Sequence, residues 1–467
     1  MSKVRTRFAP SPTGELHIGN ARTALFAFLY AKKSGGTFIL RLEDTDVERS
    51  KPEYCDAILE DMKWLGLGYD EGPYKQSERM GIYREYPERL IEKDLVYECF
   101  CTPQELEERR RIALKSGKPP VYDGRCGRLS REERERLKRE GRPFAYRFRF
   151  STFDTIEFED VVRKRVVFNP AIMGDPILVR ADGMPAYNFA CTIDDMLMGI
   201  TDVIRGEDLL DQTPRQIALL KTFGADIPRY AHLPLIFGRG KKPLSKRDGA
   251  TSVGEFKNQG FLPVALLNYL YRLGFSPETD REVLSLDEMI DLFNLEKVSS
   301  APAVFDIQKL RHINREAVRI AEISDLLDLF RSFMGDKRGA VNEDFVRVFK
   351  EEVSTLSELL EVSRFLFDEY FEPDRIAGIM RGYKNYCGDE MAREILDLFV
   401  RSCKSGRFDE EPLRRYIDEK KIKPVVAFMI PRIVLTGSEK GPSLSDIVLL
   451  LGYERVKSRI DSVLKVL

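Results

Sequence analysis

Long apolar stretches and a disulfide framework are both missing from this sequence of 467 residues. No run of about eighteen consecutive apolar residues occurs, so a membrane-spanning helix is not expected. The chain opens with a strand pattern instead of the apolar segment of a secretion signal. The seven cysteines are scattered and odd in number, which is typical of a reducing compartment. These absences predict a cytoplasmic protein with no membrane partner.

The sequence also lacks an excess of either charge, because it contains 75 Lys and Arg and 76 Asp and Glu, for a net charge of −1. A chain coated in basic residues is therefore excluded, and a nucleic acid would have to meet local basic faces. Residues 101–150 hold 15 Lys and Arg against 8 Asp and Glu, and residues 401–467 hold 14 against 9. Each excess indicates either a solvated helix face or a surface for RNA.

The length of the chain argues against a single core, and about three or four domains are expected. The hydrophobic fraction of 43% is ordinary for a globular protein. No internal repeat or low-complexity segment is present. The sequence thus predicts several conventional domains rather than a repeat array.

The most informative stretch is Pro10–Asn20, which reads P-S-P-T-G-E-L-H-I-G-N. A strand pattern at 4–9 precedes it and a helical pattern at 21–33 follows it. The β-branched and apolar residues at 37–42 predict a second strand. In such a β-turn-α-β unit, ligands bind outside the carboxyl ends of the strands.

The chemistry of this turn favours a phosphate ligand. Pro10 and Pro12 stiffen the approach, because each fixes φ and lacks an N–H. Gly14 and Gly19 have no Cβ, so a ligand can come close to the backbone. His17 stands just before a helix start, where unpaired N–H groups and a positive dipole end attract anions. A lone histidine in a turn would more often be merely half-buried, but the whole stretch is far more specific.

Two further motifs follow in order. Arg41–Asp46 reads R-L-E-D-T-D, and Pro243–Arg247 reads P-L-S-K-R. Pro10–Asn20 resembles the "HIGH" signature of class I aminoacyl-tRNA synthetases in the form typical of glutamyl-tRNA synthetases, with Asn20 in place of the last histidine. Pro243–Arg247 resembles the "KMSKS" loop of the same family, with Pro243 in place of the first lysine. The phrase W-L-G-L-x-Y-D-E-G-P from Trp64 also resembles that family.

The resemblance implies an α/β fold, built on a doubly wound, Rossmann-like catalytic domain that an inserted domain interrupts. An all-helical C-terminal half is expected to bind the anticodon, and the pattern after residue 320 is almost purely helical, including a helix over 356–367. The expected domains are catalytic (1–80 and 186–250), inserted and acceptor-end-binding (81–185), stem-contact (251–320) and anticodon-binding (321–467, in two subdomains with a break near 375).

The same resemblance implies ATP-dependent activation of L-glutamate to glutamyl-adenylate, followed by transfer of the glutamyl group to the 3′ end of tRNA(Glu). The activation step is expected to require bound tRNA. A carboxylate is already ionised near neutral pH, so the task is to position groups and stabilise phosphate charge. Mg²⁺ is expected through the ATP phosphates, without a protein cage. The residues implied for catalysis are His17, Lys246 and Arg247, and those implied for ATP are Pro10, Ser11, Pro12, Thr13, Gly14, His17, Gly19, Asn20, Ser245 and Lys246.

An amino acid with one ammonium and two carboxylates requires opposite charges in its pocket. Arg7 and Arg205 both fall at strand ends that face one crevice, and arginine can bind a carboxylate through two N–H groups. By resemblance, Arg7 reads the side-chain carboxylate with help from Arg205, and Glu43 holds the α-ammonium. The alternative for both arginines is a structural salt bridge with Glu43 or Glu207. The implied glutamate site consists of Arg7, Ser11, Glu43, Tyr187 and Arg205.

A cysteine cluster is expected within the inserted domain. Cys99, Cys101 and Cys126 with Tyr122 could supply three thiolates and a phenolate to a tetrahedral, structural zinc ion. Some relatives use this C-x-C…Y-x3-C arrangement, and others use a histidine where this chain has Arg128. Reduced structural cysteines are the alternative, and the residues leave both readings open.

The expected partners are tRNA(Glu) and L-glutamate, and a non-discriminating enzyme would also charge tRNA(Gln). A monomer is expected from family habit. A shortened relative that glutamylates a tRNA base, or a small-molecule adenylyltransferase, has no use for the helical half. A tRNA-binding protein with a dead active site is opposed by the intact His17, Glu43, Arg205 and Lys246.

The variant Arg7→Lys is expected to lose far more glutamate activation than ATP binding, because lysine cannot bind a carboxylate bidentately. The measurement compares the KM for glutamate with the affinity for ATP in one preparation. Equal losses of both would indicate misfolding instead of a role in reading glutamate.

Overall fold

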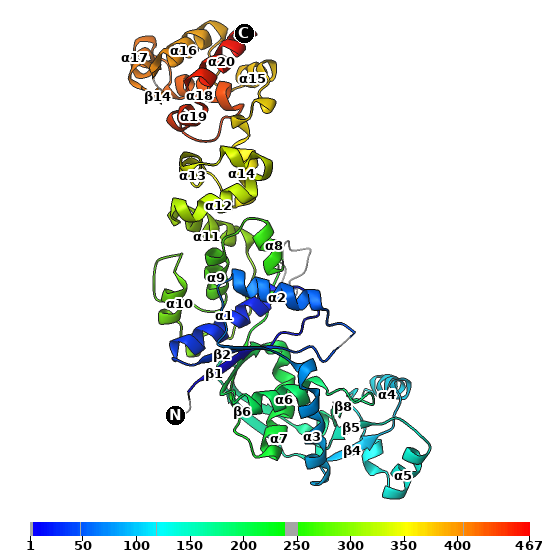
Figure 1. Ribbon diagram of the computed structural model, residues 1–467. Helices are drawn as coiled ribbons and strands as arrows, with labels where there is room; N and C mark the ends of the chain where they lie inside the picture. Colours follow the sequence, from blue (N-terminus) through cyan, green and yellow to red (C-terminus); the bar gives the residue numbers. More distant parts are fainter. Residues whose placement is uncertain (1–2, 47, 118, 239–250, 405) are drawn as a thin grey trace. The chain divides into compact units, whose positions relative to one another are not determined.

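The computed structural model describes residues 3–46, 48–117, 119–238, 251–404 and 406–467. The chain forms two compact units, each treated by itself (Figure 1). Unit 1 comprises Met1–Phe256 and Leu266–Ile307, and unit 2 comprises Lys257–Ala265 and Gln308–Leu467.

The main sheet of unit 1 has the strand order β3-β2-β1-β9-β10-β6-β7 within the described residues. The pairings are parallel except for the antiparallel pair β6/β7. The strand order changes direction between β1 and β9, which makes this the switch point where α/β sheets bind ligands. The predicted doubly wound fold is confirmed, with strands at Arg5–Phe8 (β1), Thr37–Leu42 (β2), Glu71–Lys75 (β3), Ile156–Asp160 (β6), Lys164–Phe168 (β7), Asp202–Gly206 (β9) and Arg229–Leu233 (β10).

Helices cover both faces of this sheet, as the nearly continuous burial of β1, β2 and β9 requires. Figure 1 shows α1 and α2 on one side and α3, α6 and α7 on the other. Helix α1 begins at Ile18, earlier than the predicted residue 21, because His17 caps it. The bounds are Ile18–Lys33 (α1), Pro52–Trp64 (α2), Met80–Ile91 (α3), Tyr187–Leu197 (α6) and Thr213–Phe223 (α7).

A second, antiparallel sheet in the order β4-β5-β8 lies within the range predicted for the inserted domain. Strands β6 and β7 fall in the same range, 81–185, yet they join the main sheet, and the boundaries of the inserted domain stay a prediction. Phe148 and Leu178 of the small sheet share one apolar cluster with Phe189 and Ile193 of α6. The bounds are Val96–Cys99 (β4), Ala145–Phe148 (β5) and Ile177–Val179 (β8).

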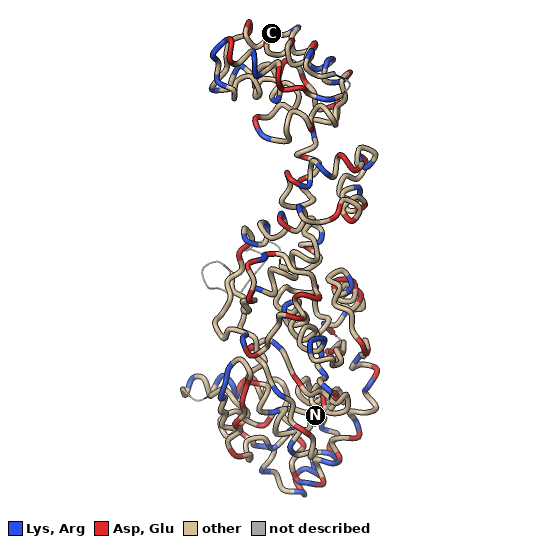
Figure 2. Tube along the Cα trace, turned by 90° about the vertical axis from the view of Figure 1, so that its left-hand side faces the viewer, with Lys and Arg blue, Asp and Glu red and all other residues tan. Residues whose placement is uncertain are grey.

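The basic segment 101–150 forms two surface helices, Pro103–Lys115 (α4) and Arg131–Arg139 (α5). Each begins with a capping box in which a hydroxyl and a glutamate exchange hydrogen bonds with the backbone. Neither helix buries a residue. Figure 2 shows Lys and Arg interspersed with Asp and Glu along the trace, consistent with the net charge of −1.

The stretch from residue 236 to 307 contains short elements. These are Ile236–Phe237 (β11), which pairs with Ala303–Val304 (β12), and the helices Val253–Asn258 (α8), Pro263–Arg272 (α9) and Leu286–Leu292 (α10).

Among its described residues, the C-terminal unit is helical apart from the short antiparallel pair Cys403–Lys404 (β13) and Arg407–Phe408 (β14). No helix in the described ranges is long and apolar enough to span a membrane. The helices are Ile307–Ile320 (α11), Ile323–Met334 (α12), Glu343–Phe349 (α13), Leu359–Val362 (α14), Pro373–Arg381 (α15), Asp389–Ser402 (α16), Glu411–Lys420 (α17), Pro424–Thr436 (α18), Leu444–Leu451 (α19) and Tyr453–Leu464 (α20).

The continuous helix predicted over 356–367 is wrong, because only α14 is α-helical there, between short 3-10 turns. Arg459 of α20 donates to the Phe365 carbonyl at 2.5 Å, and Arg455 donates to the Leu366 carbonyl at 2.6 Å. These carbonyls are therefore satisfied by side chains from α20 instead of by a following helical turn.

Candidate active site

The loop after β1 is tied to the end of β2 and to the start of α2. The Pro10 carbonyl accepts from the Glu43 N–H at 3.0 Å, and the Pro12 carbonyl accepts from the Lys51 N–H at 3.2 Å. Both prolines are buried, whereas Ser11 and Thr13 are exposed. The loop is thus held by its backbone and presents its hydroxyl groups outward.

His17 is the N-cap of α1, and its Nδ1 accepts a hydrogen bond from the Gly19 N–H at 3.2 Å. Burial lowers the pKa of His17, although the charge of Glu255 opposes this shift. The imidazole is therefore neutral near pH 7, and because Nδ1 accepts, Nε2 carries the proton. Within the described residues the Asn20 N–H has no hydrogen-bond partner. The helix start thus offers one side-chain and one backbone donor to an anion.

A buried ion network stands at the end of β1 and β2. Arg7 and Arg41 both contact Asp195 of α6, at 3.3 Å and 2.8 Å, and Arg41 contacts Glu43 at 2.9 Å. Burial alone would lower the pKa of Arg7, but Asp195, with smaller contributions from Cys191 and Glu43, outweighs it and the pKa rises. Burial would likewise raise the pKa of Asp195, yet Arg7 and Arg41 hold it below its ordinary value. All three groups are therefore charged.

Glu43 behaves differently from Asp195. Burial raises the pKa of Glu43 although Arg41 and Arg7 oppose the shift. One carboxylate oxygen accepts from Arg41, and the other accepts no hydrogen bond from the described residues. A cation that reached the second oxygen would favour the ionised form.

Arg205, in β9, has a buried guanidinium with neutral partners. Its Nε donates to His232 Nε2 at 3.1 Å, its Nη2 donates to the Thr213 hydroxyl at 2.8 Å, and its Nη1 lies 3.5 Å from the Tyr187 hydroxyl. Within the described residues it forms no salt bridge, and the suggested partner Glu207 is paired with Arg163 instead. Arg205 is only 3% exposed, so its charge is buried without a carboxylate partner among the described residues.

Four of the five predicted glutamate residues, Arg7, Glu43, Tyr187 and Arg205, come together around Tyr187, the first residue of α6, whereas Ser11 is exposed and forms no hydrogen bond with them within the described residues. The hydroxyl of Tyr187 lies beside Arg205, and burial raises its pKa well above the ordinary value, with electrostatic contributions from Arg205, Glu43 and Arg7. Arg7 forms a salt bridge, but with Asp195 and not with Glu43 or Glu207, and its role in binding glutamate stays a prediction. The salt-bridge alternative does not hold for Arg205 within the described residues.

Sequence reasoning missed the carboxylates of α6 and the histidine of β10. Asp194 accepts from Gln76, Arg79 and Tyr83, which ties α6 to the segment before the small sheet. Its neighbour Asp195 faces the arginines of the main sheet. The two adjacent aspartates in an otherwise apolar helical stretch could have indicated a buried ion network, because buried charges require partners.

Ser245, Lys246 and Arg247 lie outside the described residues. The residues that follow them reach the HIGH-like turn: the Thr251 carbonyl accepts from the Ile18 N–H at 3.0 Å, and the Leu16 carbonyl accepts from the Val253 N–H at 2.9 Å. His17 and Ser252 form a bridge between these two bonds. Thr251–Val253, which follow the lysine-containing segment in the sequence, are therefore fixed beside His17.

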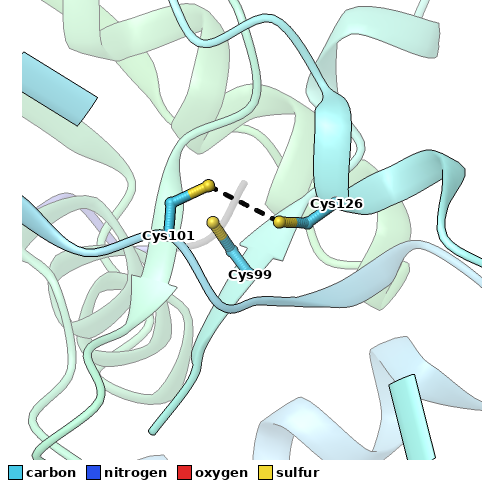
Figure 3. A group of neighbouring side chains, drawn as sticks. All are labelled: Cys99, Cys101 and Cys126. Carbon is cyan, nitrogen blue, oxygen red and sulfur yellow. Dashed lines mark hydrogen bonds between the residues drawn. The ribbon is translucent and has the colours of Figure 1, made fainter. Parts of the chain in front are cut away.

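Cys99, Cys101 and Cys126 converge on one point in the small sheet (Figure 3). Their sulfur atoms all lie within 4.8 Å of one another, and Cys101 and Cys126 are 3.6 Å apart. The Tyr122 hydroxyl lies 3.5 Å from the Cys99 sulfur and 3.9 Å from the Cys101 sulfur. A tetrahedral Zn–S site has sulfur atoms about 3.8 Å apart, so this donor set fits a zinc ion.

Comparison with known proteins gives a consistent picture. The family described as "tRNA synthetases class I (E and Q), catalytic domain" matches residues 3–312, and "Anticodon binding domain" matches residues 325–464. The glutamate–tRNA ligase of Aquifex aeolicus is 42% identical over 100% of this chain and 99% of its own length. That of Carboxydothermus hydrogenoformans is 41% identical over 98% and 99%.

A solved structure is similar over the full length. It is the glutamate tRNA ligase from Elizabethkingia meningosepticum in complex with its amino acid, with a TM-score of 0.87, 32% identity and coverage of 99% of both chains.

The variant Asp195→Asn is expected to lower the free energy of unfolding by about 3–5 kcal/mol at pH 7, because it leaves two buried guanidinium groups short of a counterion. Since the pKa of Asp195 is below its ordinary value in the folded state, this stabilisation is present above that value and is lost as the pH falls below it. Denaturant unfolding measures the difference. Glu157→Gln, which breaks the exposed pair with Arg165, is the control and should change little. Equal effects of the two substitutions would contradict the importance of the buried network.

Proposed function

The chain belongs to the class I tRNA synthetases of the glutamate and glutamine group, as a member of the glutamate–tRNA ligases, and from this premise we propose how its site recognises the substrates. The enzyme activates L-glutamate with ATP and transfers it to the 3′ end of tRNA(Glu). Activation waits for tRNA. Mg²⁺ bound through the ATP phosphates supplies charge neutralisation.

The observation that carries the assignment of the glutamate site is the uncompensated charge of Arg205 at the switch point. A buried guanidinium without a carboxylate partner is costly unless an anion completes it. The carboxylates of glutamate fit this need, and a substrate with a neutral side chain would leave one guanidinium unpaired. Arg205 and Arg7 bind the side-chain carboxylate, Glu43 holds the α-ammonium through its free oxygen, and Ser11 and Tyr187 line the pocket.

The ATP phosphates bind at the start of α1. His17 donates through Nε2, and the backbone N–H of Asn20 donates beside it, with Gly19 leaving room for the approach. Pro10, Pro12, Thr13 and Gly14 shape the loop that faces the nucleotide. Lys246 and Arg247 supply positive charge that neutralises the departing pyrophosphate, and Ser245 adds a hydroxyl group that can donate to a phosphate oxygen. The bridge between His17 and Ser252 supports their proximity.

The helical unit binds the tRNA through a cavity of about 600 Å³. Arg364 stacks on Tyr370 at 4.4 Å from the ring, and Phe371, Arg375 and Lys440 also line the cavity. Cationic and aromatic side chains around a hollow suit splayed, single-stranded bases. This unit contains residues 325–464, which match the anticodon-binding domain. The side chains that line the cavity would determine whether the anticodon of tRNA(Gln) is accepted together with that of tRNA(Glu).

Charging of purified tRNA(Glu) and tRNA(Gln) with labelled glutamate tests the proposal. Charging of tRNA(Glu) should depend on ATP, and exchange of pyrophosphate into ATP should be negligible without tRNA. Charging of tRNA(Gln) in the same assay would identify a non-discriminating enzyme.

The control reaction contains labelled glutamine instead of glutamate and should give no product. Robust pyrophosphate exchange in the absence of tRNA, or charging with glutamine, would contradict the proposed specificity. The cytoplasmic location and the monomeric state stay predictions.

The cysteine cluster holds a structural zinc ion, with Cys99, Cys101, Cys126 and Tyr122 as ligands. A hydrogen bond from Cys126 lowers the pKa of Cys99 although burial opposes the shift, which favours a thiolate ligand. The cluster joins β4 to the turn at Tyr122–Cys126, so the ion would fix the base of the small sheet.

Protein that has been washed with a mild chelator is expected to retain about one zinc ion per chain by elemental analysis, because four protein ligands close a structural site. Cys126→Ser should lose the ion and lower the Tm, and Cys387→Ser, which changes a cysteine outside the cluster, is the control. A zinc-free protein with an unchanged Tm would instead establish reduced structural cysteines.

A further inference from the structure

A chain of buried polar groups lies behind Arg205. His232 of β10 is fully buried and is the register partner of Arg205 in β9. Its Nδ1 lies 2.6 Å from an oxygen of Asp160, at the end of β6. Its Nε2 lies 3.1 Å from Arg205 Nε and 3.0 Å from the Thr213 hydroxyl. Three neighbouring strands thus contribute one group each to a line that ends at the proposed glutamate pocket.

The proton positions in this line follow from the donor inventory. Arg205 Nε–H can only donate, so His232 Nε2 must accept and the ring proton must sit on Nδ1. Nδ1–H then donates to Asp160, whose carboxylate also accepts from the backbone N–H groups of Val162 and Arg163 at 2.9 and 2.8 Å. Burial lowers the pKa of His232 although Asp160 opposes the shift, so the imidazole is neutral. Asp160, with its pKa held low by the hydrogen bond from His232 against the effect of burial, is ionised.

The contacts of Arg205 also determine which edge of its guanidinium group is available to bind a substrate carboxylate. His232 and Thr213 occupy the Nε and Nη2 side of Arg205. The end that bears Nη1 points toward Tyr187, where the only contact within the described residues is a long one of 3.5 Å. The free edge is therefore the one that can bind a carboxylate with two N–H groups.

We propose that Asp160 and His232 are positioning residues for glutamate recognition, which hold Arg205 through a neutral acceptor so that its charge and its free edge remain available to the substrate carboxylate. A carboxylate in the place of His232 would hold the guanidinium as firmly but would cancel its charge. The inference rests on the proposed glutamate site and adds two residues that do not contact the substrate.

Two isosteric replacements of His232 separate its two hydrogen bonds. The amide of His232→Asn reaches the position of Nδ1, so it can still donate to Asp160 but offers nothing to Arg205. The amide oxygen of His232→Gln reaches the position of Nε2 and can still accept from Arg205. Asp160→Asn keeps an acceptor for Val162 and Arg163 but donates to His232 Nδ1. With Nδ1 as the acceptor, the ring proton moves to Nε2. The Nε2–H group and the Nε–H group of Arg205 then face each other as two donors, and the hydrogen bond between them is lost.

The experiment measures aminoacylation of tRNA(Glu) by the full chain, with separate KM values for glutamate, ATP and tRNA, and the Tm of each variant. His232→Asn and Asp160→Asn are expected to raise the KM for glutamate about 10- to 100-fold, the size of one hydrogen bond to a charged group, with the KM for ATP changed less than about twofold. His232→Gln should recover most of this loss. The matched control is Thr6→Val, which removes a buried hydrogen bond from β1 of the same sheet to the Ala27 carbonyl of α1.

The outcomes are decisive. A selective rise in the KM for glutamate, with partial rescue by glutamine at position 232, supports the positioning role. Unchanged KM values, equal losses for the Asn and Gln variants, or a fall in Tm with all KM values raised together, as a purely structural role predicts, would overturn it. Failure of the unmodified protein to charge tRNA(Glu) would refute the proposed function itself, which is a separate result.

Discussion

The ion pair between Arg7 and Asp195 is the constraint on which the site depends. It joins β1 to α6 at the point where the strand order changes direction, and Arg41 of β2 shares the same carboxylate. Removing one partner of a buried pair leaves an uncompensated charge, so these elements cannot separate without a large cost. The neighbouring Asp194 accepts hydrogen bonds from Arg79 and Tyr83, which connects α6 to the segment that precedes the small sheet. The crevice therefore keeps its shape because buried ion pairs join its walls in addition to the apolar contacts of α6 with the sheet.

Against this balanced network, Arg205 stands out because its partners are neutral. Arg7 is matched by Asp195, and Arg41 is matched by Asp195 and Glu43. Arg205 is held by an imidazole and a hydroxyl instead. The same sheet edge thus contains two guanidinium groups that have carboxylate partners within the protein and one, of Arg205, whose charge is left for a ligand. This division explains how a pocket can be both rigid and attractive to an anion.

Much of the fold was accessible from the sequence, because the first strands and helix are local and strongly patterned. The strand at 37–42 was predicted at its observed bounds. The segment 356–367 was not, because side chains of Arg455 and Arg459, far along the chain, take its carbonyls. In the site, motifs pointed to Arg7, Glu43, Tyr187 and Arg205. Asp160 and His232 carry no motif, since their contact exists only because β10 lies between β9 and β6.

The strand order also explains why a histidine connects Arg205 to Asp160. Register places His232 beside Arg205, and the end of β6 brings Asp160 to the far side of the ring. An imidazole spans this gap and presents an acceptor on one side and a donor on the other. Asp160 is itself stabilised by backbone N–H groups of the β6/β7 turn and of His232. A negative charge can therefore be buried one residue away from Arg205, where it fixes the ring without occupying the edge that faces the ligand.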